Sequence, residues 1–223
     1  MFNVKLMSYS QPPAQSEFSN DLLQMVAYCA RVSNPSNQNN EATSQKLVEY
    51  LIKHKHWSPL EMVSVCMEID TTRDIARQIL RHRSFSFQEF SQRYADPTKD
   101  LSFVTRDARF QDTKNRQASV DIDETNEVHR RINEDFRMKQ MSLIRKSREV
   151  YDWAIDKGIA KEQARAVLPE GLTNSRMYVN GTLRSWIHYI DLRAGNGTQK
   201  EHMEIAKACG EVIHNIFPLD GLL

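Results

Sequence analysis

The chain has 223 residues, of which 40% are hydrophobic and 26% charged, and its formal net charge is +1. A total so close to neutral argues against a general nucleic-acid coat or a membrane-surface protein, since both need an extended basic field. No run approaches the ~20 apolar residues that span a bilayer, and the N-terminus has no apolar signal segment. Any site for anions must therefore be local.

Three cysteines, Cys29, Cys66 and Cys209, form no spaced framework. Their odd number suits a reducing compartment, so we expect a cytoplasmic protein. Free cysteine usually packs as a small buried hydrophobe, and we expect this of each.

In chain order, the first half predicts two helices, a strand and a third helix. Apolar residues recur at helical spacing over 20–33 and over 39–56. Residues 61–69 are β-branched and partly alternating, which predicts a strand. A helix over 72–83 follows, with a threonine as its cap.

The second half begins with a polar stretch, 95–122, which lacks a sustained period and predicts an excursion or long loop, with a short strand over 101–105 as one option. The elements after it are a long amphipathic helix over 123–157, helical turns over 161–169, a strand over 173–181, and helices over 182–193 and 199–216. We therefore expect one α+β domain over 1–223, with helices packed around a central, mostly antiparallel sheet.

The segment RHRSFSFQEFSQRY, residues 81–94, gathers guanidinium groups in a nearly neutral chain. If its end is extended, Glu89, Ser91 and Arg93 point to one side. Guanidinium forks match phosphate oxygens, and a carboxylate accepts from sugar hydroxyls. The segment therefore indicates a phosphorylated ligand with a polar ring. The alternative is that these arginines pair with surface carboxylates, as single arginines usually do.

Several common motifs are absent from the sequence. The close glycine pair, Gly195 and Gly197, follows a predicted helix rather than a strand, so no dinucleotide-binding fingerprint is present. There is no Walker loop, and no CxxC or HExxH motif that would indicate zinc. Phosphate recognition must come from side chains more than from a glycine-rich loop, and we expect no metal.

The arginine segment also carries a spaced pattern: R-H-R, seven residues, S, one residue, R. Arg81-His82-Arg83, Ser91 and Arg93 fill it, and it resembles the signature of the flavin-dependent thymidylate synthases. Other stretches resemble the same family in the same order: KHKHWSPLE (53–61), ARQILRHR (76–83), ARAVLP (164–169), RSWIHYIDLR (184–193) and, more weakly, TQKE (198–201). The resemblance covers nearly the whole chain.

This resemblance implies a homotetramer with FAD at subunit interfaces. It also implies methylation of dUMP, with methylenetetrahydrofolate as carbon donor and NADPH-reduced FAD as hydride source. The implied dUMP contacts are Gln78, Arg81, Glu89, Ser91, Gln92, Arg93, Arg165 and Arg193. The implied FAD contacts are Ser58, Arg81, His82, Arg83, Glu89, Thr182, Arg184 and His188, with His56 near flavin and folate. Arg193 is the implied catalytic residue, placed against the uracil to favour ionisation at N3.

The chain departs from the family pattern at five positions: Met62, Gln92, Thr182, His188 and Gly197. They affect the details of flavin and phosphate contact. Two other readings stay open. A nucleic-acid-binding module also combines arginines with phenylalanines, although Glu89 interrupts this segment. A non-catalytic scaffold would lack bound flavin and turnover.

Overall fold

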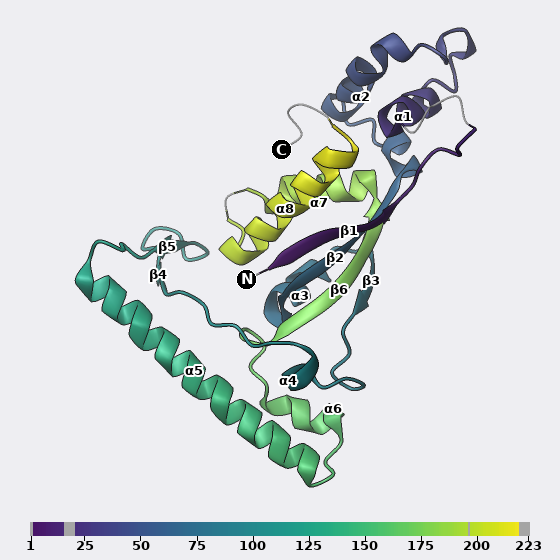
Figure 1. Cartoon of the computed structure of the whole chain (residues 1–223). Coiled ribbons are helices and arrows are strands. Elements are labelled where there is room, and N and C mark those ends of the chain that lie inside the picture. Colours follow the sequence, from purple (N-terminus) through teal and green to yellow (C-terminus); the bar gives the residue numbers. More distant parts are fainter. Residues whose placement is uncertain (1, 16–20, 196, 219–223) are drawn as a thin grey trace.

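Four antiparallel strands form the centre of the protein, in the order β1-β2-β6-β3 (Figure 1). The structure is a computed structural model that describes residues 2–15, 21–195 and 197–218. The strands of this sheet are β1 (Asn3–Tyr9), β2 (Ser64–Thr72), β3 (Ser86–Glu89) and β6 (Asn174–Thr182), and β4 (Arg109–Gln111) and β5 (Ser119–Asp121) pair separately. The helices are α1 (Leu22–Ala30), α2 (Ser44–Lys53), α3 (Arg73–Ile79), α4 (Pro97–Asp100), α5 (Glu127–Asp156), α6 (Lys161–Ala164), α7 (Leu183–Arg193) and α8 (Lys200–Ile216). The predicted α+β fold is confirmed.

The core lies on one face of the sheet. β2 and β6 pair along nine residues, and Met67 and Val179, paired and both fully buried, are typical of the face that α3, α7 and α8 cover. Trp186 of α7 packs into this core and donates its indole N–H to the Val65 carbonyl, 3.0 Å away. The other face carries polar pairs such as Asp70 with Arg176. This alternation is the usual pattern of an antiparallel sheet with one covered face.

The boundaries of the elements differ from the predictions at several ends. Asp21 caps α1 through its side chain, and Asn20, at the start of the predicted helix, lies outside the described residues. β2 starts at Ser64, because residues 58–62 form a short 3-10 helix. α3 ends at Ile79, four residues before the predicted end.

Two strand predictions were incomplete. β1 was not predicted, although Val4 and Leu6 alternate with Asn3 and Lys5 and indicate a half-buried strand. The extended conformation considered for 89–94 was wrong. β3 ends at Glu89, and the backbone N–H groups of Tyr94 and Ala95 both donate to the Ser91 carbonyl, which closes a turn.

The excursion over 95–122 holds little regular structure. It contains the four-residue α4, a single bridge from Phe103 to Thr173, and the short hairpin of β4 and β5. The optional strand over 101–105 is thus reduced to one bridge. Backbone hydrogen bonds from Val104 to Leu172 and from Asn174 to Ser102, the packing of Phe103 on a small apolar cluster, and polar side chains attach this part of the chain to the rest.

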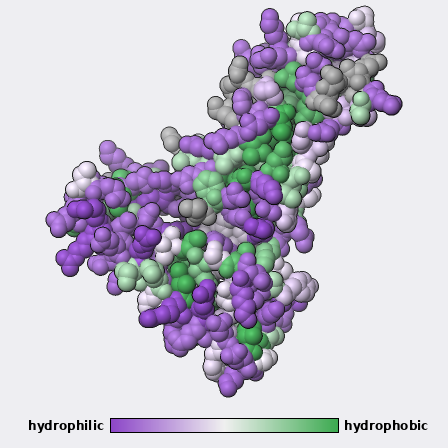
Figure 2. All heavy atoms as spheres, viewed as in Figure 1, coloured by the Kyte–Doolittle hydropathy of each residue, from purple (hydrophilic) through white to green (hydrophobic). Residues whose placement is uncertain are grey.

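The long helix α5 does not pack on the sheet. It begins at Glu127 because Asn126 accepts hydrogen bonds from two N–H groups of the first turn, so its start lies four residues later than predicted. Val128, Ile132 and Phe136, on its apolar stripe, are 65%, 40% and 44% exposed. Figure 1 shows α5 crossing the lower part of the molecule, away from the sheet, and Figure 2 shows apolar patches among hydrophilic side chains in that region.

The cysteine prediction is confirmed for one residue of three. Cys209 is fully buried in the core, whereas Cys29 and Cys66 are only partly buried, and all three are free thiols. No helix within the described ranges is both long enough and apolar enough to cross a membrane.

A substitution at Gly181 tests the close packing of the Phe85 ring against this glycine. A Cβ atom at this position would overlap the ring of Phe85, which also packs at a tilted angle against Trp186, with 4.6 Å between ring centres. Overpacking a core costs about 1–3 kcal/mol, so we expect Gly181→Ala to lower the free energy of unfolding in urea by that amount. Gly171→Ala is the matched control, because its Cβ would meet no atom closer than 3.8 Å. Equal stability of the two variants would contradict this packing.

Candidate active site

The first group of predicted site residues lies where α3 and α7 end, and we call Gln78, Arg81, His82 and Arg193 the helix-end cluster. Arg193 Nε donates to His82 Nε2 at 3.0 Å. Since a guanidinium can only donate, this nitrogen of His82 is unprotonated. Burial lowers the pKa of His82, and the charges of Arg193 and Arg81 lower it further. His82 is therefore a neutral ring with its proton on Nδ1.

Gln78 connects the helix-end cluster to α8. Its Nε2 donates to Gln199 Oε1 at 2.8 Å, and its Oε1 lies 3.2 Å from Nδ1 of His202. His202 is fully buried, and its ring centre lies 6.3 Å from that of His82. Sequence reasoning assigned no role to Gln199 or His202. The only signal was the weak match of TQKE, 198–201, to a family segment.

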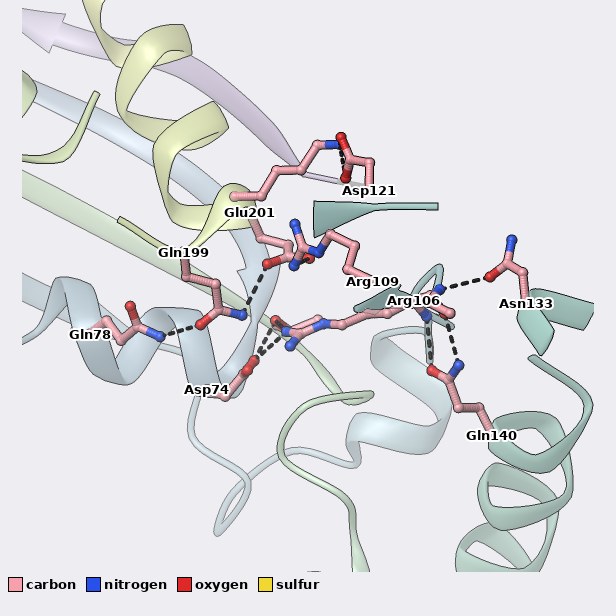
Figure 3. A network of polar contacts seen from close by, with 12 residues as sticks. Asp74, Gln78, Arg106, Arg109, Asp121, Asn133, Gln140, Gln199 and Glu201 are labelled. Atoms are coloured by element: carbon pink, nitrogen blue, oxygen red, sulfur yellow. Dashed lines mark hydrogen bonds and ion pairs between the residues drawn. The ribbon is translucent and has the colours of Figure 1, made fainter. Parts of the chain in front are cut away.

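A polar network continues from Gln199 to the excursion (Figure 3). Gln199 Nε2 donates to Glu201 Oε2 at 2.9 Å, and Arg109 of β4 donates to Glu201 Oε1 at 2.6 Å. Burial by itself would raise the pKa of Glu201. The hydrogen bonds from Arg109 and Gln199 outweigh burial and hold the pKa of this carboxyl below its usual range. Glu201 is therefore ionised at neutral pH.

Glu89 lies apart from the helix-end cluster. Its carboxylate accepts from Ser175 Oγ at 2.8 Å and pairs with Arg73 at 3.5 Å and Arg77 at 3.7 Å. Its side chain is only 15% exposed. Arg73, Arg77 and Arg81 follow one another at intervals of four residues. The first two pair with Glu89, whereas Arg81 does not.

A second group of predicted residues lies where β3 ends, and we call Ser91, Gln92, Arg93 and Arg165 the strand-end cluster. Arg93 Nε pairs with Glu162 of α6 at 3.2 Å, and α6 leads directly into the turn that carries Arg165. Gln92 is buried, and its Nε2 has no hydrogen-bond partner among the described residues.

A third group surrounds the start of α7, and we call Ser58, Thr182, Arg184 and His188 the helix-start cluster. Thr182 is the N-cap of α7 and accepts from the Ser185 N–H. Arg184 forms an ion pair with Glu61, and His188 meets Trp57 edge to face at 4.3 Å between ring centres. His56 is exposed just before Ser58. The hydroxyl of Thr182 is thus engaged in capping.

The three clusters are separated within one chain. Ser86 pairs with Asn180, and the Phe90 N–H donates to the Arg176 carbonyl. Ser86 and Phe90 are four positions apart, so about 13 Å of extended chain lies between the helix-end and strand-end clusters. The nine-residue β6 is about 30 Å long at ~3.3 Å per residue, and the helix-start and strand-end clusters lie near its opposite ends. Within the described ranges, no hydrogen bond or ion pair joins one cluster to another.

The arginines of the predicted site fall into two kinds. Some already have a partner: Arg93 pairs with Glu162, as the alternative reading of segment 81–94 expected, Arg184 pairs with Glu61, and Arg193 donates to His82. Arg81, Arg83 and Arg165 make no side-chain hydrogen bond or ion pair with any described residue. Their guanidinium groups are therefore available to a ligand.

Comparison with known proteins gives the class and the family. A family model described as thymidylate synthase complementing protein matches residues 16–219. A protein of Paramecium bursaria Chlorella virus 1 is 46% identical over 217 residues, which are 97% of this chain and 95% of that protein. The flavin-dependent thymidylate synthase of Synechocystis sp. is 48% identical over 195 residues, covering 87% of this chain and 85% of that enzyme.

The fold is also known from a solved structure. The UMP/dUMP methylase PolB from Streptomyces cacaoi, bound with 5-Br dUMP, superposes with a TM-score of 0.80 at 23% identity and covers 98% of this chain and 92% of its own. This chain thus shares the fold of that solved structure. The chain belongs to the flavin-dependent thymidylate synthase family, so the predicted resemblance is confirmed.

The buried His202 gives a test of the site by pH. Burial, with the charge of Arg193, lowers the pKa of His202 to about 4, whereas in an unfolded chain it is about 6.5. Between these values the unfolded state binds more protons, so stability falls as pH falls. We expect His202 to reduce the free energy of unfolding by up to about 3 kcal/mol over this window. His202→Gln removes the titrating group and keeps a polar side chain, so urea unfolding of the variant should lose less stability on acidification. A wild-type–variant difference that is independent of pH would contradict this.

Proposed function

We propose that this chain catalyses the reductive methylation of dUMP to dTMP. In this proposal methylenetetrahydrofolate supplies the carbon, and FAD reduced by NADPH supplies the hydride. Family membership supports the reaction class, and the donor set of the helix-end and strand-end clusters supports a phosphorylated substrate. The observation that carries the proposal is the free guanidinium groups of Arg81, Arg83 and Arg165.

The residues present fit both phosphorylated ligands. Arg81 and Arg83 are exposed and unpaired beside the neutral ring of His82, so they can donate to the phosphates of FAD without breaking an ion pair. Ser58, Thr182, Arg184 and His188 would contact the same cofactor from the helix-start cluster, with His56 toward the folate. Glu89 would contact it from the end of β3. When bound, the flavin supplies the hydride chemistry, and the protein supplies binding and electrostatics.

We assign the role of the catalytic cation to Arg193. Its Nε is already used by His82, so its terminal N–H groups remain to face the uracil. A fixed cation beside a developing anion lowers the pKa of the ligand and stabilises the charged form most in a dry site. We therefore assign to Arg193 the ionisation of the ring at N3, with Gln78 as a further ring contact.

The separation of the clusters supports a site shared between copies of the chain. About 13 Å of strand separates the helix-end and strand-end clusters of one chain, which favours a dUMP site completed by a second copy. We propose that Arg81, Gln78 and Arg193 of one copy meet Ser91, Gln92, Arg93 and Arg165 of another. The exposed apolar stripe of α5 gives such copies a surface to bury, in agreement with the expected homotetramer.

Arg81→Ala tests the proposed ligand site. A charge-assisted hydrogen bond contributes about 2 kcal/mol, so we expect about 30-fold weaker binding of dUMP. The measurement is the change in flavin absorption when dUMP is titrated into the purified protein. Arg116→Ala is the control, because Arg116 is an exposed arginine of the β4–β5 loop with no ion pair among the described residues. A wild-type protein that neither takes up FAD nor responds to dUMP would refute the synthase proposal.

A further inference from the structure

A line of four side-chain hydrogen bonds runs from the excursion to the core, and Figure 3 shows its part from Arg109 to Gln78. Arg109 donates to Glu201, Gln199 donates to Glu201, and Gln78 donates to Gln199. The last member is His202, whose Nδ1 lies 3.2 Å from Gln78 Oε1. The line therefore joins β4, α8 and the end of α3. It includes Gln78, which we assign to the substrate.

The direction of every bond in this line follows from the carboxylate. An ionised carboxylate only accepts, so Gln199 must turn its NH₂ toward Glu201 and its carbonyl oxygen toward Gln78. Gln78 must then present its own NH₂ to Gln199. Its carbonyl oxygen is left for His202, and Nδ1 of that ring must carry the proton.

The state of His202 agrees with this direction. The side chain is fully buried, and its Nε2 has no hydrogen-bond partner within the described part of the chain. Its pKa of about 4 keeps the ring neutral, so it carries one proton only. That proton is used on Nδ1, and Nε2 is a bare acceptor.

The excursion holds the start of the line in place. Arg106 donates to Thr72 and Asp74, each at 2.7 Å, and its backbone exchanges two hydrogen bonds of 2.8 Å with Gln140 of α5. Arg109 follows three residues later. The otherwise irregular segment thus has a defined position relative to α3 and α5.

We propose that Glu201, held by Arg109, is a positioning residue that fixes the orientation of the Gln78 amide and thereby the donor that Gln78 offers to the substrate. The proposal rests on the assignment of Gln78 to dUMP. It gives the excursion a function that the sequence did not indicate, because Arg109 belongs to that segment.

Glu201→Gln should exchange donor and acceptor in each hydrogen bond from residue 201 to His202. Arg109 can only donate, so it keeps the oxygen of the new amide, and the NH₂ takes the place of Oε2. Gln199 must then accept from residue 201 and donate to Gln78. Gln78 must in turn donate to His202, whose proton moves from Nδ1 to Nε2. One oxygen replaced by NH₂ should thus change a tautomer three hydrogen bonds away.

The measurement is side-chain ¹⁵N NMR of histidine-labelled full-length holoenzyme, with the His202 signals identified by their loss in His202→Gln. We expect an Nδ1–H tautomer in the wild type and an Nε2–H tautomer in Glu201→Gln. Gln199→Leu breaks the line and should leave a mixture. Lys200→Met is the matched control. Lys200 lies on the same helical turn as Glu201 and pairs with Asp121 of β5, but it is no member of the line. This variant should retain the wild-type tautomer.

An Nε2–H tautomer in the wild type, or an unchanged tautomer in folded Glu201→Gln, would overturn the proposal. Binding of dUMP is the second measurement. Reversal swaps the donor and acceptor that Gln78 offers, so we expect about tenfold weaker dUMP binding in Glu201→Gln, equivalent to about 1.4 kcal/mol, and wild-type binding in Lys200→Met. If the tautomers behave as expected but the wild type does not bind dUMP, the proposed function fails and the line stands.

Discussion

The antiparallel pairing of β2 with β6 determines where the site lies. Each strand passes through a threonine directly into a helix, Thr72 into α3 and Thr182 into α7. Because the strands are antiparallel, the helices start at opposite ends of the sheet and run back along it. Their lengths, about 10 Å and about 16 Å, together match the ~30 Å of the paired strands. The helices therefore end close together, and Arg193 reaches His82.

The sequence predicted the elements that build this arrangement, because their patterns are strong and local. It also predicted, through family resemblance, the residues that gather at the helix ends. It could not predict which arginines remain free. Arg73 and Arg77 find Glu89 only because β3 runs back beside β6, and Arg93 finds Glu162 across a gap of many residues. Such pairings depend on tertiary structure, and spacing along a helix does not contain them.

The position of the excursion was equally unpredictable from sequence pattern. A polar segment without period predicts a loop, and the segment is indeed mostly irregular. Its position depends on single side chains, such as Arg106 with Asp74 and Arg109 with Glu201, which have no periodic signal. Likewise the apolar stripe of α5 was visible in the sequence, but a pattern does not say whether it faces the chain's own core or another surface.

The central claim is that one site draws on two copies of the chain. Arg81→Ala weakens dUMP binding at the helix-end cluster and Arg165→Ala at the strand-end cluster, so each variant alone should show little activity at dUMP concentrations well below its Kd. Copies mixed by unfolding and refolding together should regain about a quarter of the wild-type activity, because each site takes one cluster at random from either variant. Mass spectrometry would establish that mixed oligomers form. Mixed oligomers that remain inactive would contradict the claim.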